Sequence, residues 1–424
     1  MKWVKKIVWI CLLLSILTLP VWADGPARIE RTTVNGMPIL LQRTNSEVVE
    51  VTMLLKSGSG LDGKKKGTAE LMNMLVYLKL LSAPESLGSV NVLTRPDYTE
   101  IRIQASAENL KNVLVELESL LTTPLYSYDV IMDLKQFLIA DIKGMPAFNK
   151  TYYETNRSFY GPDHPYNDYL EPEVVESITG HDVYRWYRQT YQPGNAILSI
   201  AGGVKESMDQ IAKIFSNMLY ESVDQRLLIQ PVIPNQTRLI EREDYNGRIA
   251  SICMGFGAPR IQDPEYPAFR IIAYYLEDYQ YYFEKLRIEE GLMYTGMVYY
   301  SYLERPQAPN IVFLTMTDPD DLFLVEAKTL DIIEELKEKG IEQSMIAQIA
   351  EAIEKEGKSR IQAVIGASRR NVMSYYLQNQ LVYDENLWPK LKQVTTADIQ
   401  KAAAKYLNHY VRVAYVPREK PDNF

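Results

Sequence analysis

Three side chains lie one helical turn apart early in the chain, at a spacing that metal-binding helices use. In the segment Gly67–Tyr77, Glu70, Asn73 and Met74 stand at positions i, i+3 and i+4, so they would share one side of a helix. In a His-x-x-Glu-His zinc helix, two imidazoles at this spacing bind the metal and a glutamate activates water. Both imidazoles are missing here.

The residues that replace the motif are poor substitutes for it. Glu70 could supply one oxygen ligand, but the Met74 thioether is unsuited to zinc and Asn73 has no basic carboxylate to take a proton from water. The chain has only three histidines, without the spacing of metal ligands: His164, His181 and His409. The alternative interpretation is an ordinary packed helix with an apolar face made of Ala69, Met72, Val76 and Leu80. The sequence predicts no metal cofactor in this chain.

Length and charge limit the classes of function. A chain of 424 residues can form two domains of about 200 residues, each with its own core. The net charge of -8 argues against nucleic acid as a partner, because displacing counterions from phosphates needs a basic surface.

The N-terminus has the features of a secretory signal peptide. Residues 1–23 begin with three lysines, continue in an apolar run too short to span a bilayer, and end in Val21-Trp22-Ala23. Cleavage before Asp24 would leave Cys253 as the only cysteine, so no intramolecular disulfide is expected. We therefore expect an exported protein, located in the periplasm and without a membrane contact after cleavage.

The segments around residues 67–80 predict the elements that would position this helix. A hairpin is expected at residues 28–43, with Asn35-Gly36 as its turn. Strands are expected at residues 48–56, 89–94 and 98–105, and helices at residues 107–121, 128–145 and 179–191, followed by a strand at 195–200.

The second half of the chain repeats the first. Residues 178–200, a helix followed by an apolar strand, correspond to residues 394–415 about one domain length later. Residues 248–257 likewise correspond to the strand at 48–56, and residues 265–276 to the helix that begins at Gly67. The predicted fold class is α+β, with two homologous domains, each an antiparallel-rich sheet packed with helices. Their predicted bounds are 24–220 and 237–424, joined by a proline-containing linker at 221–236.

Several of these segments together resemble the insulinase or pitrilysin family of zinc peptidases, which includes mitochondrial processing peptidase. The resemblance covers essentially the whole mature chain. It is carried by Val34-Asn35-Gly36, Ser57-Gly58-Ser59, the stretch from Tyr160-Gly161-Pro162 to Tyr166, residues 178–203, and Leu286-Arg287-Ile288-Glu289-Glu290-Gly291-Leu292-Met293-Tyr294. Members are built from paired homologous α+β domains, and a peptide is held in a chamber between two such pairs.

The resemblance implies that one family signature is lost and another is kept. Glu70 to Met74 occupies the place of the zinc motif, and the family's third ligand, a glutamate, falls near Asp141. Arg287 and Tyr294 match the arginine and tyrosine that members carry in the second domain, where the pair reaches the peptide carbonyl and the developing oxyanion. The alternative is that Arg287 pairs with Glu289 or Glu290 and Tyr294 packs. The family's glycine-rich loop is replaced by the bulkier residues Leu276 to Gln280.

These observations predict a metal-free subunit of a heterodimeric peptidase. Arg287 and Tyr294 would act on a peptide at the zinc site of a homologous partner chain. Two alternatives stay open: a non-catalytic binding or scaffold protein of the same fold, and a stand-alone peptidase with an atypical metal site at Glu70 and Asp141.

Overall fold

The computed structural model describes residues 29–83, 87–123, 128–218, 227–244, 247–278, 280–363, 365–377 and 386–418. The predicted signal peptide at 1–23 and residues 221–226 of the predicted linker lie outside these ranges. No helix within them is long and apolar enough to cross a membrane.

The first half of the chain builds a six-stranded sheet, called sheet A here. Its order is β1-β2-β6-β3-β5-β4, and only β2 and β6 are paired in parallel. Asn35 and Gly36 have positive φ angles of 46° and 76° at the predicted hairpin turn, as a turn of type I′ requires. The strands are β1 Ile29–Val34, β2 Met37–Arg43, β3 Val48–Leu55, β4 Ser89–Thr94, β5 Thr99–Ser106 and β6 Ala196–Gly202.

Helices cover the outer face of sheet A. The predicted helix after Gly67 is α1, which spans Thr68–Leu81 and buries Ala69, Met72, Val76 and Leu80 in the core of this half. The other helices of the first half are α2 Leu110–Thr122, α3 Tyr128–Gly144, α4 Ala147–Tyr160, α5 Pro172–Glu176, α6 Gly180–Thr190 and α7 Met208–Ile214.

The second half builds a five-stranded sheet, sheet B, with the order β7-β11-β8-β10-β9. Its one parallel pair is β7 with β11, and the other neighbours are antiparallel. Sheet B therefore repeats sheet A without β1, and β8 takes the place of β3 as predicted. The strands are β7 Arg238–Asp244, β8 Ala250–Gly257, β9 Thr295–Tyr300, β10 Asn310–Thr317 and β11 Tyr410–Pro417.

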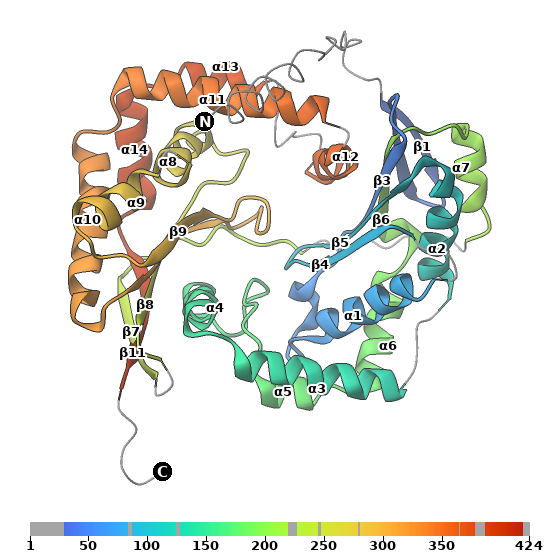
Figure 1. The fold of residues 1–424 in the computed structure, drawn as a ribbon, viewed down its shortest axis with the longest axis horizontal. Helices are drawn as coiled ribbons and strands as arrows, with labels where there is room; N and C mark the ends of the chain where they lie inside the picture. Colours follow the sequence, from blue (N-terminus) through green and yellow to red (C-terminus); the bar gives the residue numbers. More distant parts are fainter. Residues whose placement is uncertain are drawn as a thin grey trace, which may run out of the picture.

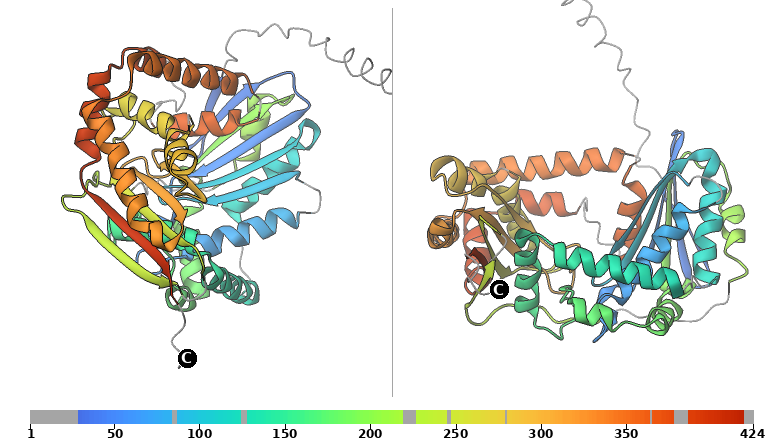
Figure 2. Two further views of the ribbon diagram at one scale, coloured as in Figure 1. Left: turned by 60° about the vertical axis from the view of Figure 1, so that its left-hand side comes forward. Right: turned by 60° about the horizontal axis from the view of Figure 1, so that its bottom comes forward.

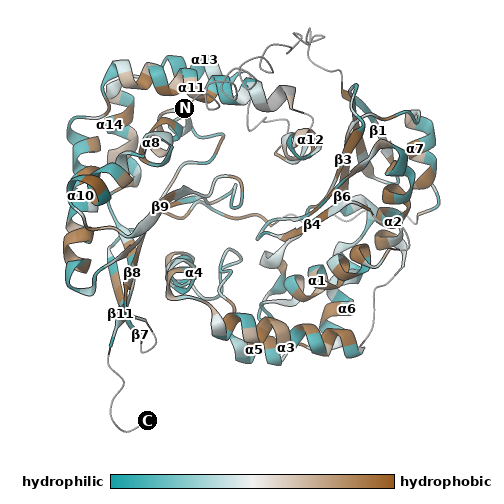
Figure 3. Cartoon of the chain, viewed as in Figure 1, coloured by the Kyte–Doolittle hydropathy of each residue, from teal (hydrophilic) through white to brown (hydrophobic). Residues whose placement is uncertain are grey.

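The helices of the second half follow the same plan. The structure has α8 Tyr266–Glu277, α9 Tyr281–Phe283, the π-helical turn η4 Glu284–Glu289, α10 Leu322–Glu338, α11 Gln343–Gln362, α12 Ala367–Tyr376, α13 Leu387–Lys392 and α14 Thr396–Tyr406. Figure 3 shows hydrophilic and hydrophobic residues side by side on these helices, as expected where a helix covers a core on one side only.

The repeat is visible in the way two helices begin. α6 starts with a capping box in which the Thr179 hydroxyl accepts from the Asp182 amide, and the Asp182 carboxylate accepts from the Thr179 amide. α14 starts with the same box, made by Thr395 and Asp398. Because each box satisfies two otherwise unpaired backbone groups, the shared Thr-x-x-Asp pattern fixes the same helix start in both halves.

One helix from each half crosses to the sheet of the other half. α12 packs on β6 and β3 of sheet A, and α4 packs on β11 and β8 of sheet B. Figure 1 shows α4 beside β8, and α12 opposite β3 at the top of the molecule; Figure 2 shows the same exchange from two other directions. We call α4 and α12 the crossing helices.

Polar contacts hold α12 on sheet A. The Gly366 amide, at its N-terminus, donates to the Glu50 carboxylate, and Thr52 and Ser368 share a hydrogen bond of 2.6 Å. Arg369 donates from Nε to both oxygens of Glu100 at 2.9 Å. The inner face of sheet A is therefore buried and carries these polar residues beside apolar ones such as Leu54, which packs with Val372 of α12.

Polar contacts also hold α4 on sheet B. The Asn310 side-chain amide donates to Asn156 at 2.9 Å, and the Glu154 carboxylate accepts from Arg242 Nε and the Tyr415 hydroxyl, each at 2.7 Å. The Thr155 methyl group lies only 3.1 Å from the position a Cβ would take on Gly255. A glycine at this point of β8 lets the helix approach the sheet closely.

Candidate functional site

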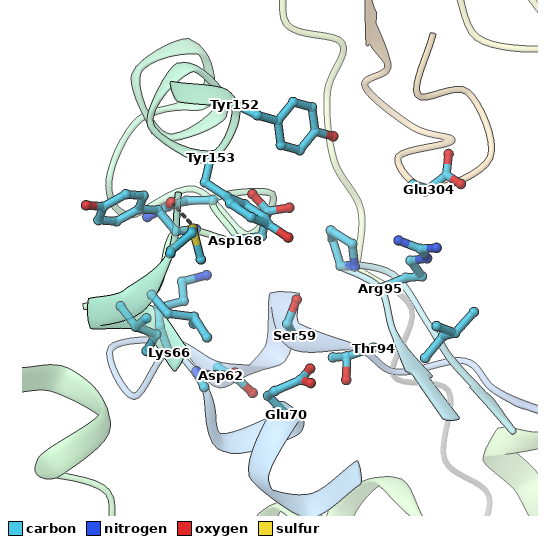
Figure 4. A pocket seen from close by; sticks show the side chains of 18 of the residues that line it. Ser59, Asp62, Lys66, Glu70, Thr94, Arg95, Tyr152, Tyr153, Asp168 and Glu304 are labelled. Carbon is cyan, nitrogen blue, oxygen red and sulfur yellow. Dashed lines mark hydrogen bonds between the residues drawn. The ribbon is translucent and has the colours of Figure 1, made fainter. Parts of the chain in front are cut away.

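A cavity of about 580 Å³ lies where the two halves meet beside α1. Its walls come from the start of α1, the end of β4, the second half of α3, α4 and the loop after it, and from β9 with the loop that follows. Figure 4 shows Glu70, Lys66, Arg95, Tyr153 and Asp168 around this space. We call it the α1 cavity.

Asp62 fixes the N-terminus of α1 at the bottom of the α1 cavity. Its carboxylate accepts from the amides of Gly67 at 2.9 Å and Ala69 at 3.0 Å, which would otherwise lack partners. Gly67 has φ 102° at this turn, a conformation that favours glycine. Burial raises the pKa of Asp62 to about 7, although the two amides and Lys66 oppose the shift.

Glu70 and Asp141 both reach the α1 cavity. Burial raises the pKa of Glu70, and the neighbouring Asp141 carboxylate acts in the same direction, while a hydrogen bond from Thr94 and the charge of Arg95 oppose it. Asp141 is exposed on α3. The structure therefore brings together the two carboxylates that the sequence singled out.

Asn73 and Met74 do not line this cavity. The Asn73 side chain is 3% exposed; it donates to Thr94 at 2.9 Å and Thr99 at 3.2 Å, and accepts from the Tyr191 hydroxyl at 2.8 Å. Met74 packs against the core of the first half. Glu70 therefore lines the α1 cavity, whereas Asn73, about one turn later on α1, is buried in the interior.

The residues of the α1 cavity do not fit a catalytic zinc ion. They offer carboxylates and no imidazole, whereas zinc prefers histidine and cysteine with at most a few oxygen ligands. Within the ranges the structure describes, no group of three His, Cys, Asp or Glu side chains could hold a metal ion.

None of the three histidines lines the α1 cavity. His164 accepts from the Tyr166 amide at 3.0 Å and stacks on the Tyr160 ring at 5.1 Å. Burial, together with the charge of Lys66, lowers the pKa of His164. His181 and His409 are exposed, at the start of α6 and just before β11.

Four basic residues line the α1 cavity, Lys150 on α4 among them, and none was identified as a site residue from the sequence. Lys66 precedes α1, Arg95 follows β4, and Arg305 comes from the loop between β9 and β10 of the second half. Arg305 is 2% exposed, pairs with Asp168, and donates to the Tyr152 hydroxyl at 3.3 Å. No local sequence pattern identifies these residues, because they come together only where segments far apart in the sequence form the cavity.

Arg287 and Tyr294 lie together on the surface of the second half. Arg287, on η4, donates to the Tyr294 backbone carbonyl at 2.5 Å and lies over the Phe283 ring, 5.1 Å from its centre. The Tyr294 side chain is 53% exposed, with its hydroxyl 3.4 Å from Asp318. Glu289 and Glu290 pair with lysines instead, so the alternative of an ion pair to Arg287 is wrong.

The bulky segment Leu276 to Gln280 has two parts with different surroundings. Leu276 is buried in the core of the second half. Gln280 has a positive φ of 55° and lines a second, open hollow with Phe283 and Ile288. Position 279 lies outside the described residues.

A protein-family model supports the resemblance seen in the sequence. The model described as "Peptidase M16 inactive domain" matches residues 177–353. No curated protein sequence matches the chain.

Solved structures confirm the predicted α+β fold class. A protease from Helicobacter pylori aligns with a TM-score of 0.80 at 18% identity, and a peptidase M16 inactive domain from Pseudomonas fluorescens with 0.80 at 17%; each alignment covers 93% of this chain and 100% of the other. The periplasmic protease PqqL from Escherichia coli aligns with 0.67 at 16% identity, over 95% of this chain and 48% of PqqL. At these identities the likeness concerns the fold.

Proposed function

Because this chain has the M16 peptidase fold and matches the family's inactive domain over residues 177–353, we propose that it is the zinc-free subunit of a heterodimeric peptidase. In this proposal a homologous partner chain carries the zinc site. The present chain contributes Arg287 and Tyr294 and helps to bind the peptide substrate.

The position of Arg287 and Tyr294 carries the proposal. Neither residue lines the α1 cavity. In Figure 1, α9, which leads directly into η4, lies at the left edge of the molecule, whereas α1 lies at the lower right. Since both side chains are exposed and neither lines the cavity that holds Glu70, we place the reaction that they assist on another chain.

The length of the chain supports a partner of the same kind. The present chain aligns with 48% of PqqL, and it covers 93% of a separately solved first half of that protease. In PqqL the equivalent of this chain is thus about half of one polypeptide. The proposed partner supplies the second half as a separate chain.

The chemistry of the pair fits stabilisation of negative charge. A guanidinium and a phenol are hydrogen-bond donors, and the Arg287 guanidinium is oriented by the Tyr294 carbonyl and the Phe283 ring before any substrate arrives. Donors fixed in this way act on charge that appears only in the transition state, and one of them typically contributes about 3 to 4 kcal/mol.

A reconstitution experiment tests the proposal. Peptidase activity on an unstructured peptide is measured for this chain, for its zinc-bearing homologue from the same host, and for their mixture. Activity only in the mixture is expected. Equal activity of the homologue alone and in the mixture would remove the proposal.

The α1 cavity favours the second candidate function, a binding or scaffold protein of the same fold. A cavity of about 580 Å³ is within the range of roughly 300 to 1,000 Å³ that ligand sites occupy. Under this alternative, Arg287→Ala with Tyr294→Phe leaves the partner's activity unchanged. A stand-alone enzyme with metal at Glu70 and Asp141 is tested by metal analysis of the purified chain, which should find about one ion per chain.

We also propose that residues 1–23 direct export to the periplasm and that the domain bounds are those given by the sequence repeat. N-terminal sequencing of the protein from a periplasmic extract tests the first point, with Asp24 as the expected start.

A further inference from the structure

Residues 286–294 carry both Arg287 and Tyr294, and we call this segment the pair loop. It begins in the π-helical turn η4, where a backbone amide donates to the carbonyl five residues earlier, from Glu290 to Lys285 at 3.2 Å. Single π-helical turns are rare and occur often at functional sites. Because most of this loop is not part of a regular helix or strand, other bonds must fix the side chains that it carries.

Two hydrogen bonds close the pair loop on itself. At its base the Leu292 amide donates to the Leu286 carbonyl at 2.7 Å, and both of these leucines are buried. At its end the Arg287 guanidinium donates to the Tyr294 carbonyl at 2.5 Å. The positions of the two functional side chains therefore depend on each other and on Leu292.

The end of β10 attaches the closed loop to sheet B. The Thr317 hydroxyl donates to the Leu292 carbonyl at 2.7 Å, and Thr317 is fully buried. At the preceding strand position, the Met316 carbonyl accepts from the Tyr294 amide at 2.9 Å. A buried carbonyl without a donor is unfavourable, so we expect the loop to shift if the Thr317 hydroxyl is removed.

We propose that Thr317 is a positioning residue for Arg287 and Tyr294. Its hydroxyl bonds to the loop backbone between the two side chains, and so holds the guanidinium and the phenol in one orientation. Donors stabilise a transition state only when they are already aligned, and a misplacement of about 1 Å can lower a rate by about 100-fold. This inference rests on the proposed function, because an orientation matters only if the pair assists a reaction.

The alternative is that Thr317 only stabilises the fold, and three variants separate the two roles. Thr317→Val keeps the branched shape and removes the hydroxyl, whereas Thr317→Ser keeps the hydroxyl. Thr52→Val is the matched control. Thr52 is also a fully buried strand threonine, and its hydroxyl shares a 2.6 Å bond with Ser368 in sheet A of the first half. Thermal unfolding shows whether the two valine variants lose similar stability.

The reconstituted two-chain peptidase gives the first measurement. Thr317→Val is expected to lower kcat by about 10- to 100-fold with little change in KM, because the lost alignment affects the transition state and not substrate binding. Thr317→Ser should restore kcat to within about threefold of the unchanged chain. Thr52→Val should leave kcat unchanged. In a chain that already carries Arg287→Ala and Tyr294→Phe, Thr317→Val should lower kcat no further.

Amide hydrogen exchange of the isolated chain gives a second measurement, which needs no partner. Thr317→Val should speed exchange in peptides covering the pair loop by at least about tenfold, because the loop opens more often once it loses its bond to the sheet. Thr52→Val should leave exchange in these peptides unchanged.

Three outcomes would overturn the inference: unchanged exchange of the pair loop in Thr317→Val, no recovery of kcat in Thr317→Ser, or an equal loss of kcat with and without the Arg287 and Tyr294 side chains. Full activity in Thr317→Val, with a loss in Arg287→Ala/Tyr294→Phe, refutes this inference alone. Full activity in Arg287→Ala/Tyr294→Phe refutes the proposed function instead. If no mixture is active, the proposed function falls, and the exchange result still decides whether Thr317 holds the loop.

Discussion

The Glu70 to Met74 segment and the Arg287–Tyr294 pair, which the sequence resemblance assigns to two family signatures, have different surroundings. In the first, Asn73 is buried and bonded to Thr94, Thr99 and Tyr191. In the second, the Tyr294 side chain is 53% exposed and the described fold makes little use of it. Asn73 thus has a structural role in the first half, while the hydrogen bonds and packing of the described fold do not explain why Tyr294 is a tyrosine.

The largest expected effect is on the reaction. In the reconstituted two-chain peptidase, Arg287→Ala combined with Tyr294→Phe should lower kcat/KM by about 100- to 1000-fold or more, since one lost donor already has roughly that effect. The thermal stability of the isolated chain should hardly change, because both residues are exposed. A large loss of stability with unchanged activity would instead show that Arg287 and Tyr294 have a structural role.

The next effect is on stability at Asn73. Asn73→Ala removes three hydrogen bonds and leaves buried partners unsatisfied, so the free energy of unfolding should fall by roughly 2 to 4 kcal/mol. Urea unfolding measures the change. Met74→Leu keeps the volume and should cost less than about 1.5 kcal/mol.

A sharper form of this test tries to restore the motif. Glu70→His, Asn73→Glu and Met74→His together recreate the zinc sequence, but position 73 faces the interior. We expect the triple variant to be less stable than Asn73→Ala and to hold no stoichiometric zinc, because the new carboxylate is buried without a cation. A stable, zinc-loaded triple variant would show that α1 can turn back toward the cavity.

Asp62 should make the free energy of unfolding depend on pH. Burial raises its pKa to about 7, whereas an unfolded aspartate has a pKa near 3.9. Between these values the folded chain holds a proton that the unfolded chain has released, so the free energy of unfolding decreases as pH rises from about 4 to about 7. Asp62→Asn should flatten this slope in urea unfolding series, and Arg287→Ala should leave it as in the unchanged chain.

The smallest expected effect lies at the ion pairs beside the surface pair. Lys328 pairs with Glu290 at 2.8 Å in an exposed position, so Lys328→Ala should hardly change stability, because water and salt screen such a pair. It should also leave the reconstituted activity unchanged, which makes it the control for Arg287→Ala. A large loss of activity in this variant would mean that the surrounding surface, and not the pair alone, is needed.

Local patterns in the sequence predicted most elements of the first half and the repeat, but none of the elements between residues 277 and 393, such as α10 and α11. The hairpin and the repeat depend on patterns of neighbouring residues, and the structure confirms them. The polar residues of the central strands are different. Glu100 alternates with apolar residues, as on a solvent-facing surface, yet it is 1% exposed because Arg369 of α12 covers it.

The candidate site, too, could be predicted only in part from the sequence. The helix period indicated that Glu70, Asn73 and Met74 lie on one side of α1. It could not predict how α1 is rotated about its axis relative to its neighbours, and that rotation directs Glu70 to the cavity and Asn73 to the interior. The α1 cavity also needs Arg305 and Tyr299 from the second half. Contacts between residues so far apart leave no period or motif, so the cavity had no signal in the sequence.

The crossing helices also affect how the chain is made. During synthesis, β6, the last strand of sheet A to be made, is complete roughly 165 residues before α12 emerges to cover Glu50, Thr52 and Glu100. At ribosomal speeds of about 5 to 20 residues per second, the inner face of sheet A stays uncovered for roughly 8 to 33 seconds. The first half can collapse early but reaches its final packing only after nearly the whole polypeptide has been translated. The chain therefore matures as one unit.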